Sequence, residues 1–555
     1  MKLFTLLSAF FLIYFPSAQA QTSATILADF TSTLQQVSQI YDSNYASQDY
    51  KYKMFGWKNE DVVRDLLARA QQDPNLTLPV AQQMLQEFFD STRDYHAQAY
   101  FAKQPYISLP IGMHSAHGRV FISYVAPTYT GPIQVGDEVL LYQKERVIVK
   151  LYELATPIYP NASGTDLRDA TRRLTARYGL LMDPIPADPN LSLSLVKPDG
   201  KSYSETLVWK GHPLAPKSID PVLFSTAPAT GPVPENLRGT MLDDPWGYSS
   251  RKSYFPLPAT VTWEAPDTDF FYAWTGTTDT GQRVGLIRIP TFSLAKPADH
   301  VTAVNAFKAL VNKMNAETDY LVIDIQGNRG GMLDYAEVLS SFFFDTPKEA
   351  YKFQYKLFPA LVKDAETSLD ELNQLQTQAD IISYFGADHY YGYPVDFDFV
   401  NDMKAMYQGL MDDAKAGTLG KPRYYNSASV KPYPGATPYM KPLFVATDAW
   451  TVSCGDWFAG FMQDHKRATI IGTPTAGGGA FTGGSVPLKA NGMLLQSIVA
   501  PIALMYRLDG SQIENLGVTP EYILEPAPSD LKDARYRQYQ RRVYKIMNRV
   551  VANLY

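Results

Sequence analysis

The chain has 555 residues, of which 45% are apolar and 19% are charged, and its formal net charge is −6. This composition is typical of a globular protein, and the length predicts two to four domains. A net acidic chain lacks the basic surface with which nucleic-acid-binding proteins displace counterions, so we expect no nucleic-acid partner.

The first twenty residues have the pattern of a secretory signal peptide. Lys2 precedes an apolar run over residues 3–15, and the segment ends in Ala-Gln-Ala at residues 18–20, the small-x-small pattern that signal peptidases recognise. The run is too short to span the ~30 Å hydrocarbon core of a bilayer comfortably. We therefore expect cleavage after Ala20, export to the periplasm or the extracellular medium, and no stable membrane insertion. The chain has a single cysteine, Cys454, so no disulfide can form within it.

Residues 21–104 are predicted to form a helical N-terminal domain. Segments 24–41 and 79–95 carry apolar residues three and four apart, and a turn-rich break separates them. Close to residue 96 the apolar period changes from helical to alternating, which predicts a boundary between a helix and a strand.

Residues 105–212 are predicted to be rich in β-structure. Three segments alternate apolar and polar residues with a period of two: 119–127, 134–149 and 191–209. An Asp-Gly pair at 199–200 predicts a hairpin turn, because glycine accepts the positive φ that tight turns require. Between the strands, residues 164–179 have the pattern of a helix.

The second half of the chain alternates strands and helices. Residues 213–260 are rich in Pro and Gly, which predicts a linker or extended arm. Strands and helices alternate over 261–348, stop at a largely helical insertion over 349–435, and resume over 436–527. The order predicts an α/β fold whose mixed sheet contains parallel strand pairs. A charged helix is expected over 528–555.

Two loops at strand ends carry the residues best placed for chemistry. Ser453 follows a buried strand and precedes a helix, where a hydroxyl faces unpaired N–H groups and the positive end of the helix dipole. Such a place can stabilise a tetrahedral oxyanion, but serine is also among the commonest helix caps. The loop from Asp324 through Gly330 and Gly331 similarly leaves N–H groups at a helix start. From these residues alone, capping and catalysis both stay open.

Together the two loops resemble the core of the C-terminal processing peptidases, also called tail-specific proteases. The resemblance lies in YLVIDIQGNRGGMLDYAEVLSSFF, which begins at Tyr320, and in PLFVATDAWTVSCGDWFAGFMQDHKRATIIGTPTAGGG, which begins at Pro442. It implies that 261–348 and 436–527 are two halves of a crotonase-like α/β protease core. It also implies that 105–212 is a PDZ-like domain, a module that binds extended chain ends.

One departure from this family changes the expected mechanism. Tail-specific proteases activate the serine with a lysine from a downstream Gly-Lys-Gly segment, and here Gly478 occupies the lysine position. DSTRDYHAQAYF, which contains His96, and DGSQIENLGVTPEYIL, which contains Glu514, instead resemble the branch of the tricorn protease core and the chlamydial protease-like activity factor. In that branch a histidine serves the serine and a glutamate orients the histidine.

The resemblance therefore implies an exported serine endopeptidase that cleaves protein or peptide substrates. Its catalytic triad would be Ser453, His96 and Glu514, with His96 as the general base. The oxyanion hole would consist of backbone N–H groups, from Cys454, Gly330 and Gly331. We expect no metal and no cofactor. The long C-terminal helix and the resemblance to the chlamydial branch also lead us to expect a homodimer.

Two other interpretations stay open. The missing lysine also fits a catalytically inactive binding protein on the same scaffold, which is known in retinoid-carrying proteins, with a peptide or hydrophobic ligand. Cys454 is a weaker candidate for the nucleophile. A zinc site is not expected, because the seven histidines include the close pair His114 and His117 but no His-Glu-x-x-His motif and no cysteine cluster.

Overall fold

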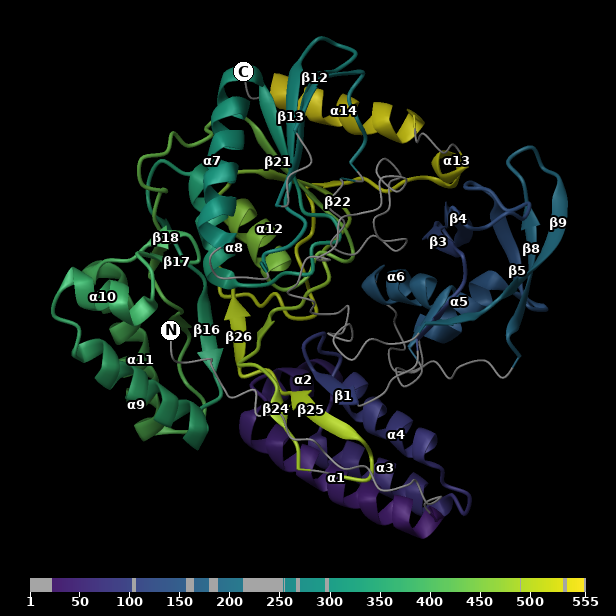
Figure 1. Cartoon of the computed structure of the whole chain (residues 1–555), viewed down its shortest axis with the longest axis horizontal. Coiled ribbons are helices and arrows are strands. Elements are labelled where there is room, and N and C mark those ends of the chain that lie inside the picture. Colours follow the sequence, from purple (N-terminus) through teal and green to yellow (C-terminus); the bar gives the residue numbers. More distant parts are fainter. Residues whose placement is uncertain are drawn as a thin grey trace. The chain divides into compact units, whose positions relative to one another are not determined.

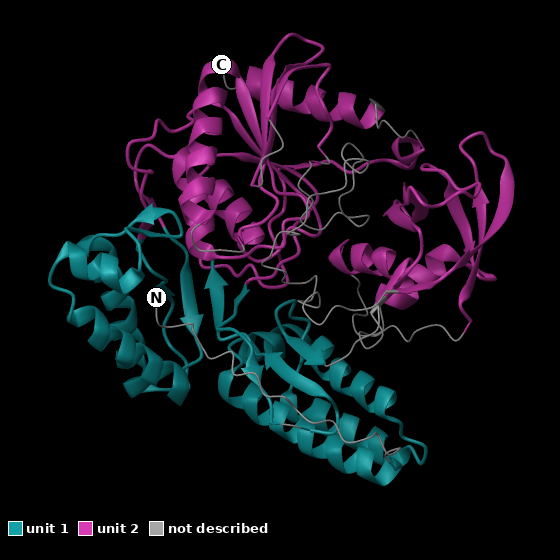
Figure 2. Cartoon of the chain, in the orientation of Figure 1, with its two compact units in different colours: residues 1–102, 350–428, 480–506 teal, residues 103–349, 429–479, 507–555 magenta. Residues whose placement is uncertain are grey.

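The computed structural model (Figure 1) describes residues 22–101, 106–155, 164–178, 188–212, 253, 255–265, 270–294, 299–489, 491–532 and 537–553. The predicted signal peptide lies outside the described residues, as does most of the predicted linker. Two compact units are each assembled from three stretches of chain (Figure 2): residues 1–102, 350–428 and 480–506 form unit 1, and residues 103–349, 429–479 and 507–555 form unit 2.

Unit 1 begins with four helices: α1 (Ser23–Asn44), α2 (Gln48–Phe55), α3 (Asn59–Gln72) and α4 (Leu78–Ser91). The two helical segments predicted from the sequence are confirmed as α1 and α4. Their apolar faces meet around the buried ring of Tyr41, which packs edge-on against Phe88 and Phe89. These contacts between aromatic rings hold the helices together beyond their individual propensities.

The remaining stretches of unit 1 supply short strands and three helices. One sheet has the order β1 (Gln98–Phe101), β25 (Leu495–Val499), β24 (Val486–Pro487), and a second has the order β19 (Arg423–Tyr424), β16 (Lys352–Tyr355), β26 (Ala503–Tyr506), β23 (Ala480–Phe481). The insertion adds α9 (Pro359–Asn373), α10 (Gln378–Phe385), α11 (Phe397–Ala416) and the hairpin β17 (His389–Tyr390), β18 (Tyr393–Pro394). Its helical character is as predicted.

Strand pairing divides the chain differently from the predicted domains. Residues 480–506, expected in the second half of the protease core, belong to unit 1. The reason is that β25 pairs with β1 and β26 pairs with β16, both antiparallel. Such pairings between distant segments leave no trace in local periodicity.

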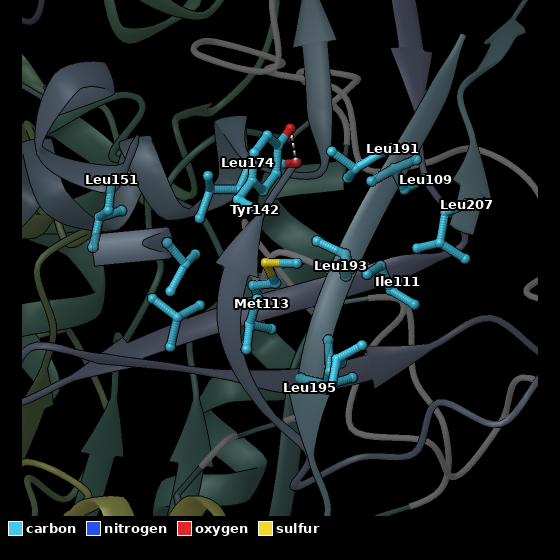
Figure 3. Close-up of a cluster of buried hydrophobic side chains, with 14 of the residues drawn as sticks. Leu109, Ile111, Met113, Tyr142, Leu151, Leu174, Leu191, Leu193, Leu195 and Leu207 are labelled. Carbon is cyan, nitrogen blue, oxygen red and sulfur yellow. Dashed lines mark hydrogen bonds between the residues drawn. The ribbon is translucent and has the colours of Figure 1, made fainter. Parts of the chain in front are cut away.

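The β-rich domain of unit 2 contains a sheet of order β3 (Ile111–Ala116), β4 (Arg119–Val125), β5 (Glu138–Tyr142), β8 (Asn190–Val196), β9 (Ser202–Val208), with β6 (Glu145–Arg146) beside β5. A smaller sheet has the order β10 (Lys210–His212), β2 (Tyr106–Ser108), β7 (Ala176–Tyr178). Helices α5 (Val147–Ala155) and α6 (Gly164–Arg173) accompany them. Figure 3 shows part of the core, in which Leu109, Leu151 and Leu193 are buried. The PDZ-like assignment of this domain stays a prediction.

Two boundaries in this domain differ from the predictions. Residues 147–149, read as the end of a strand, begin α5, because Val147, Leu151 and Leu154 are buried at helical spacing. The predicted helix 164–179 ends at Arg173, and its last residues form β7 instead. The predicted Asp-Gly hairpin turn is confirmed, since Gly200 between β8 and β9 has a φ of 92°.

The predicted protease core of unit 2 contains a seven-stranded mixed sheet. Its order is β11 (Thr260–Glu264), β12 (Tyr272–Thr277), β13 (Arg283–Arg288), β14 (Tyr320–Asp324), β21 (Leu443–Thr447), β22 (Thr469–Gly472), β27 (Tyr522–Ile523). The first three strands are antiparallel, and the strands from β13 to β27 are parallel. This arrangement confirms the predicted α/β class with a mixed sheet.

Helices lie on both faces of this sheet (Figure 1). The C-terminal region forms α13 (Pro528–Leu531) and α14 (Arg537–Ala552), and α14 buries Val543 and Met547 in one core with the strands. The helices α7 (Asp299–Glu317), α8 (Leu333–Ser340) and α12 (Cys454–Asp464) contact one another or neighbouring strands. Among the described helices, none is long and apolar enough to cross a membrane. Because β14 and β21 are adjacent and parallel, the loops that follow them emerge at the same edge of the sheet.

Candidate active site

Ser453 occupies the sharp turn between β21 and α12, and its backbone is strained. Its φ is 62° and its ψ is −121°, a combination that non-glycine residues rarely adopt. Holding it costs of order 1–3 kcal/mol, and such strain gathers at active sites. The side chain is partly buried rather than enclosed. A strained serine between a strand and a helix is the geometry of serine nucleophiles in hydrolases.

The glycine loop after β14 lies directly against this turn. Val452 N–H donates to the Asn328 carbonyl at 3.0 Å, which joins the two loops. A Cβ added to Gly330 would lie 2.6 Å from Ser453 Cβ and 2.8 Å from Cys454 N, so only glycine fits this contact. The structure thus brings together three of the residues predicted from the sequence.

The backbone N–H groups around Ser453 differ in whether they already donate a hydrogen bond. Gly330 N–H donates to Asn328 Oδ1 at 2.8 Å. Among the described residues, no acceptor receives the N–H of Gly331 or of Cys454. Cys454 Sγ donates to the Gly331 carbonyl at 3.1 Å and so fixes these two residues to each other. The N–H groups of Gly331 and Cys454 are therefore the two that can receive an oxyanion.

The Cys454 thiol itself is poorly suited to nucleophilic attack. The side chain is buried, and burial raises the pKa of the thiol to about 12. The thiolate is the reactive form of cysteine, so a neutral thiol held on a carbonyl is inert near neutral pH.

Asp456 joins the serine turn to the segment of Gly477 and Gly478, where the sequence resemblance would place a lysine. Its fully buried carboxylate accepts from Ser453 N–H at 2.7 Å and from the Gly477 and Gly478 N–H groups at 2.9 Å each, and also from the Thr475 hydroxyl. Burial raises the pKa of Asp456 to about 6, while these four hydrogen bonds favour the ionised form. The sequence analysis missed this residue, although an acidic side chain three positions after a serine at a helix start is a capping signal.

Glu514 is fully buried beside the same segment. Asn515 N–H donates to the Gly477 carbonyl at 2.8 Å. A Cβ on Gly479 would lie only 2.4 Å from Glu514 N, so the two backbones touch. Ser453 and Glu514 consequently lie beside the same segment of unit 2, residues 477–479, called the glycine segment below. Asp456 fixes the position of this segment relative to the serine.

His96 belongs to unit 1, on the loop between α4 and β1, as the change of apolar period predicts. It is 3% exposed. Its N–H donates to Asp94 Oδ1 at 2.9 Å, and its Nδ1 lies 3.9 Å from the same oxygen. Tyr45 OH donates to Asp94 Oδ2 at 3.1 Å, and Lys51 Nζ donates to the Arg93 carbonyl at 3.0 Å. These bonds fix the backbone on both sides of Asp94 and thereby hold the histidine.

The two histidines that are close in sequence, His114 and His117, lie in different backbone elements. His114 is on β3, whereas His117 occupies the turn to β4 with a φ of 47°. Among the residues that the structure describes, no group of three or more His, Cys, Asp or Glu side chains could hold a metal ion.

Comparison with known proteins defines the class of protein. Residues 283–524, which include Ser453, Glu514, Gly330 and Gly331, match the family model described as Peptidase family S41. Residues 283–524 are thus identified as a Peptidase S41 domain, which confirms the serine-peptidase class predicted from the sequence.

Relatives extend the likeness to most of the chain. A Chlamydia pneumoniae protein is 26% identical over 556 residues, 92% of this chain and 88% of the relative, and a Chlamydia trachomatis serovar D protein is 26% identical over 558 residues. A carboxy-terminal-processing protease of Bartonella bacilliformis is 38% identical over 93 residues, which are 17% of this chain and 20% of the relative. The solved structure of mature CPAF complexed with lactacystin has a TM-score of 0.83 at 23% identity, covering 95% of this chain and 99% of that one. The fold is that of CPAF, and the predicted likeness to chlamydial proteins is confirmed.

Proposed function

We propose that the protein hydrolyses peptide bonds of protein substrates through an acyl-enzyme on Ser453. The observation that carries the proposal is the strained Ser453 backbone in contact with Gly330. Beside it are two N–H groups that meet no acceptor in the described part of the chain. Ordinary helix caps need no such strain. Protein substrates follow from the peptidase family to which residues 283–524 belong.

In this mechanism the Ser453 hydroxyl oxygen attacks the scissile carbonyl carbon. The N–H groups of Cys454 and Gly331 stabilise the oxyanion that forms, and Gly330 lets the two loops approach closely enough to aim both donors. Collapse of the tetrahedral intermediate releases the amine fragment, and water then hydrolyses the ester.

His96 is the proposed general base and Glu514 the residue that orients it. The support is the sequence resemblance, the absence of a lysine at Gly478, and the local order around each side chain. His96 sits in a hydrogen-bonded loop, and Glu514 is held against the glycine segment. His96 would accept the Ser453 proton and return it to the leaving amine, while the carboxylate stabilises the imidazolium.

The test compares residues 21–555 of the wild type with Ser453→Ala, His96→Ala and Glu514→Gln, using an unfolded protein substrate and a fluorophosphonate that labels activated serines. We expect full cleavage and labelling by the wild type, neither by Ser453→Ala or His96→Ala, and a small fraction of the activity in Glu514→Gln. His117→Ala is the matched control, because this residue occupies a turn outside the proposed site. Equal activity in His96→Ala and the wild type would remove the histidine from the mechanism. A wild type that neither labels nor cleaves would favour the binding-protein alternative.

We propose in addition that the protein is exported after cleavage at Ala20. The support is the charge, apolar run and small-x-small end of residues 1–20. Amino-terminal sequencing of the protein from its native host should begin at Gln21. An intact Met1 on the abundant form would contradict export by this route.

A further inference from the structure

We propose that helix α6 of the β-rich domain is a positioning element of the catalytic site, acting through Arg168 and Thr165 on the loop before Ser453. The proposal rests on the proposed function, since it concerns how the nucleophile is held. It assigns a catalytic dependence to a helix that lies far from the peptidase core in sequence. All the residues involved belong to unit 2.

Helix α6 contacts the turn that follows β21 through three interactions. Thr165 Oγ1 donates to the Ala449 carbonyl at 2.6 Å. The Arg168 guanidinium lies 3.9 Å from Asp448 Oδ2 and 4.6 Å from the ring centre of Trp450. A guanidinium can pair with a carboxylate and stack on an aromatic face at the same time, which a lysine does less well. The helix therefore fixes three consecutive residues, 448 to 450.

The Asp448 carboxylate, which Arg168 contacts, also joins the two loops that carry the proposed nucleophile and oxyanion donors. Asp448 Oδ1 accepts from Gly327 N–H at 2.7 Å and from Trp450 N–H at 3.0 Å. Gly327 begins the glycine loop that carries the proposed oxyanion donor. The side chains of Arg168 and Asp448 are 23% and 11% exposed, so solvent screens their attraction less than that of a surface pair.

From this junction, hydrogen bonds continue to the nucleophile. Asp448 N–H donates to Thr451 Oγ1, which donates to the Ile325 carbonyl, each at 3.0 Å. The Thr451 carbonyl accepts from Ala476 N–H at 2.8 Å, beside the glycine segment. Val452 is bonded to Asn328 of the glycine loop. Loosening residues 448 to 450 would therefore shift Ser453 relative to its oxyanion donors, and small displacements of reacting groups are costly in rate.

The experiment uses the full mature chain and two pairs of variants. Arg168→Ala removes the contacts with Asp448 and Trp450. Arg119→Ala is its control, because Arg119 pairs with Glu138 elsewhere in the same domain. Thr165→Val removes the donor to the Ala449 carbonyl, and Thr165→Ser restores it. Peptide cleavage gives kcat and KM, fluorophosphonate labelling gives the reactivity of Ser453 without a bound peptide, and thermal unfolding monitors the fold.

We expect Arg168→Ala to lower kcat and the labelling rate together by about tenfold, with KM changed by less than about threefold. Thr165→Val should show a smaller loss that Thr165→Ser recovers, while Arg119→Ala matches the wild type. Unfolding midpoints within a few degrees of each other would separate this effect from general destabilisation. Arg168→Ala with wild-type kcat and labelling would overturn the proposal.

A double-mutant cycle with Asp448→Asn tests the route. If Arg168 acts through Asp448, removing it in the Asp448→Asn background should cost less than about twofold. Fully additive losses would overturn the assignment of Asp448 as the junction. An inactive, unlabelled wild type would instead refute the proposed function itself, so the two failures are distinguishable.

Discussion

Ser453 keeps its unfavourable backbone conformation because neighbouring residues determine it from both sides. Asp456 holds its N–H, and Gly330 fills the space next to its Cβ. The cost of the strain is met by this surrounding structure, as is usual where a side chain must be presented rather than buried. At this scale the site depends on the absence of a side chain at position 330 as much as on the presence of the hydroxyl at 453.

Gly330→Ala should therefore abolish activity. The added methyl carbon would lie 2.6 Å from Ser453 Cβ, and the φ of 89° is itself unfavourable for alanine. We expect kcat/KM to fall by about 100-fold or more, and the free energy of unfolding to fall by about 1–3 kcal/mol. Peptide cleavage and chemical denaturation measure the two effects.

Gly200→Ala is the matched control for that substitution. Gly200 has almost the same φ, 92°, but nothing lies within 4 Å of its added Cβ. It should lose only the conformational part, about 1 kcal/mol, and keep full activity. Comparable losses of activity in both variants would show that backbone strain, and not contact with the serine turn, explains the requirement for glycine at 330.

Cys454 should resist alkylation in the folded protein. With a thiol pKa raised to about 12, only about one molecule in 10,000 carries the thiolate at about pH 8, against roughly a quarter for an unperturbed thiol. Because the pKa is raised, lowering the pH further only strengthens the protection. Iodoacetamide labelling followed by mass spectrometry should be about 1,000-fold slower for native than for denatured protein. Rapid native labelling with loss of activity would revive the cysteine as the nucleophile.

At the scale of elements, α12 and the glycine segment act as one body through Asp456. Each of its carboxylate oxygens accepts two hydrogen bonds, from Ser453 and Gly478 on one side and from Thr475 and Gly477 on the other. The segment in which Gly478 stands at the position predicted for a lysine thus supports the serine turn through its backbone N–H groups.

Asp456→Asn should destabilise the protein although it is nearly isosteric. An amide group at either oxygen position would face two donors, and each stranded buried donor costs about 1–3 kcal/mol. We expect a clear drop in the unfolding midpoint and loss of activity. Asp412→Asn is the control, because the Asp412 carboxylate is 54% exposed and contacts Lys415 and Gln408 on the surface of its own helix, α11. If Asp456→Asn were as stable and active as this control, the proposed junction would be wrong.

At the scale of the whole molecule, the β-rich domain and the N-terminal helices differ in their dependence on distant parts of the chain. The main core of the β-rich domain comes from residues between Ile107 and Trp209, and a small second cluster packs Ala116 and Phe121 on Leu531 of α13. The N-terminal helices instead depend on distant segments: Tyr41 OH donates to the Val499 carbonyl at 2.8 Å, and the Gln82 amide donates to the Met493 carbonyl at 2.7 Å.

Fragments should reflect this difference. Residues 106–212 expressed alone should unfold cooperatively on heating, because their main hydrophobic core lies within this one segment. Residues 22–102 should retain helical circular dichroism but melt gradually, because β1 has lost its partner β25. Circular dichroism melts of both fragments measure this. A sharp transition for residues 22–102 would show that the N-terminal helices form an independent domain.

Local pattern determined much of this protein. Apolar periods located α1, α4, α7 and most strands of the central sheet, and two separated motifs indicated the peptidase class around Ser453. These signals are readable because a helix or strand must repeat its buried positions within a few residues.

Only the tertiary structure decided the rest. It put residues 480–506 into unit 1, showed that Gly330 touches Ser453 while its own N–H is engaged, and revealed Asp448 and Asp456 as junctions. Each of these features depends on a contact between segments far apart in the chain. Such contacts are set by which buried surfaces and unpaired polar groups must satisfy one another in three dimensions, and no local period encodes that choice.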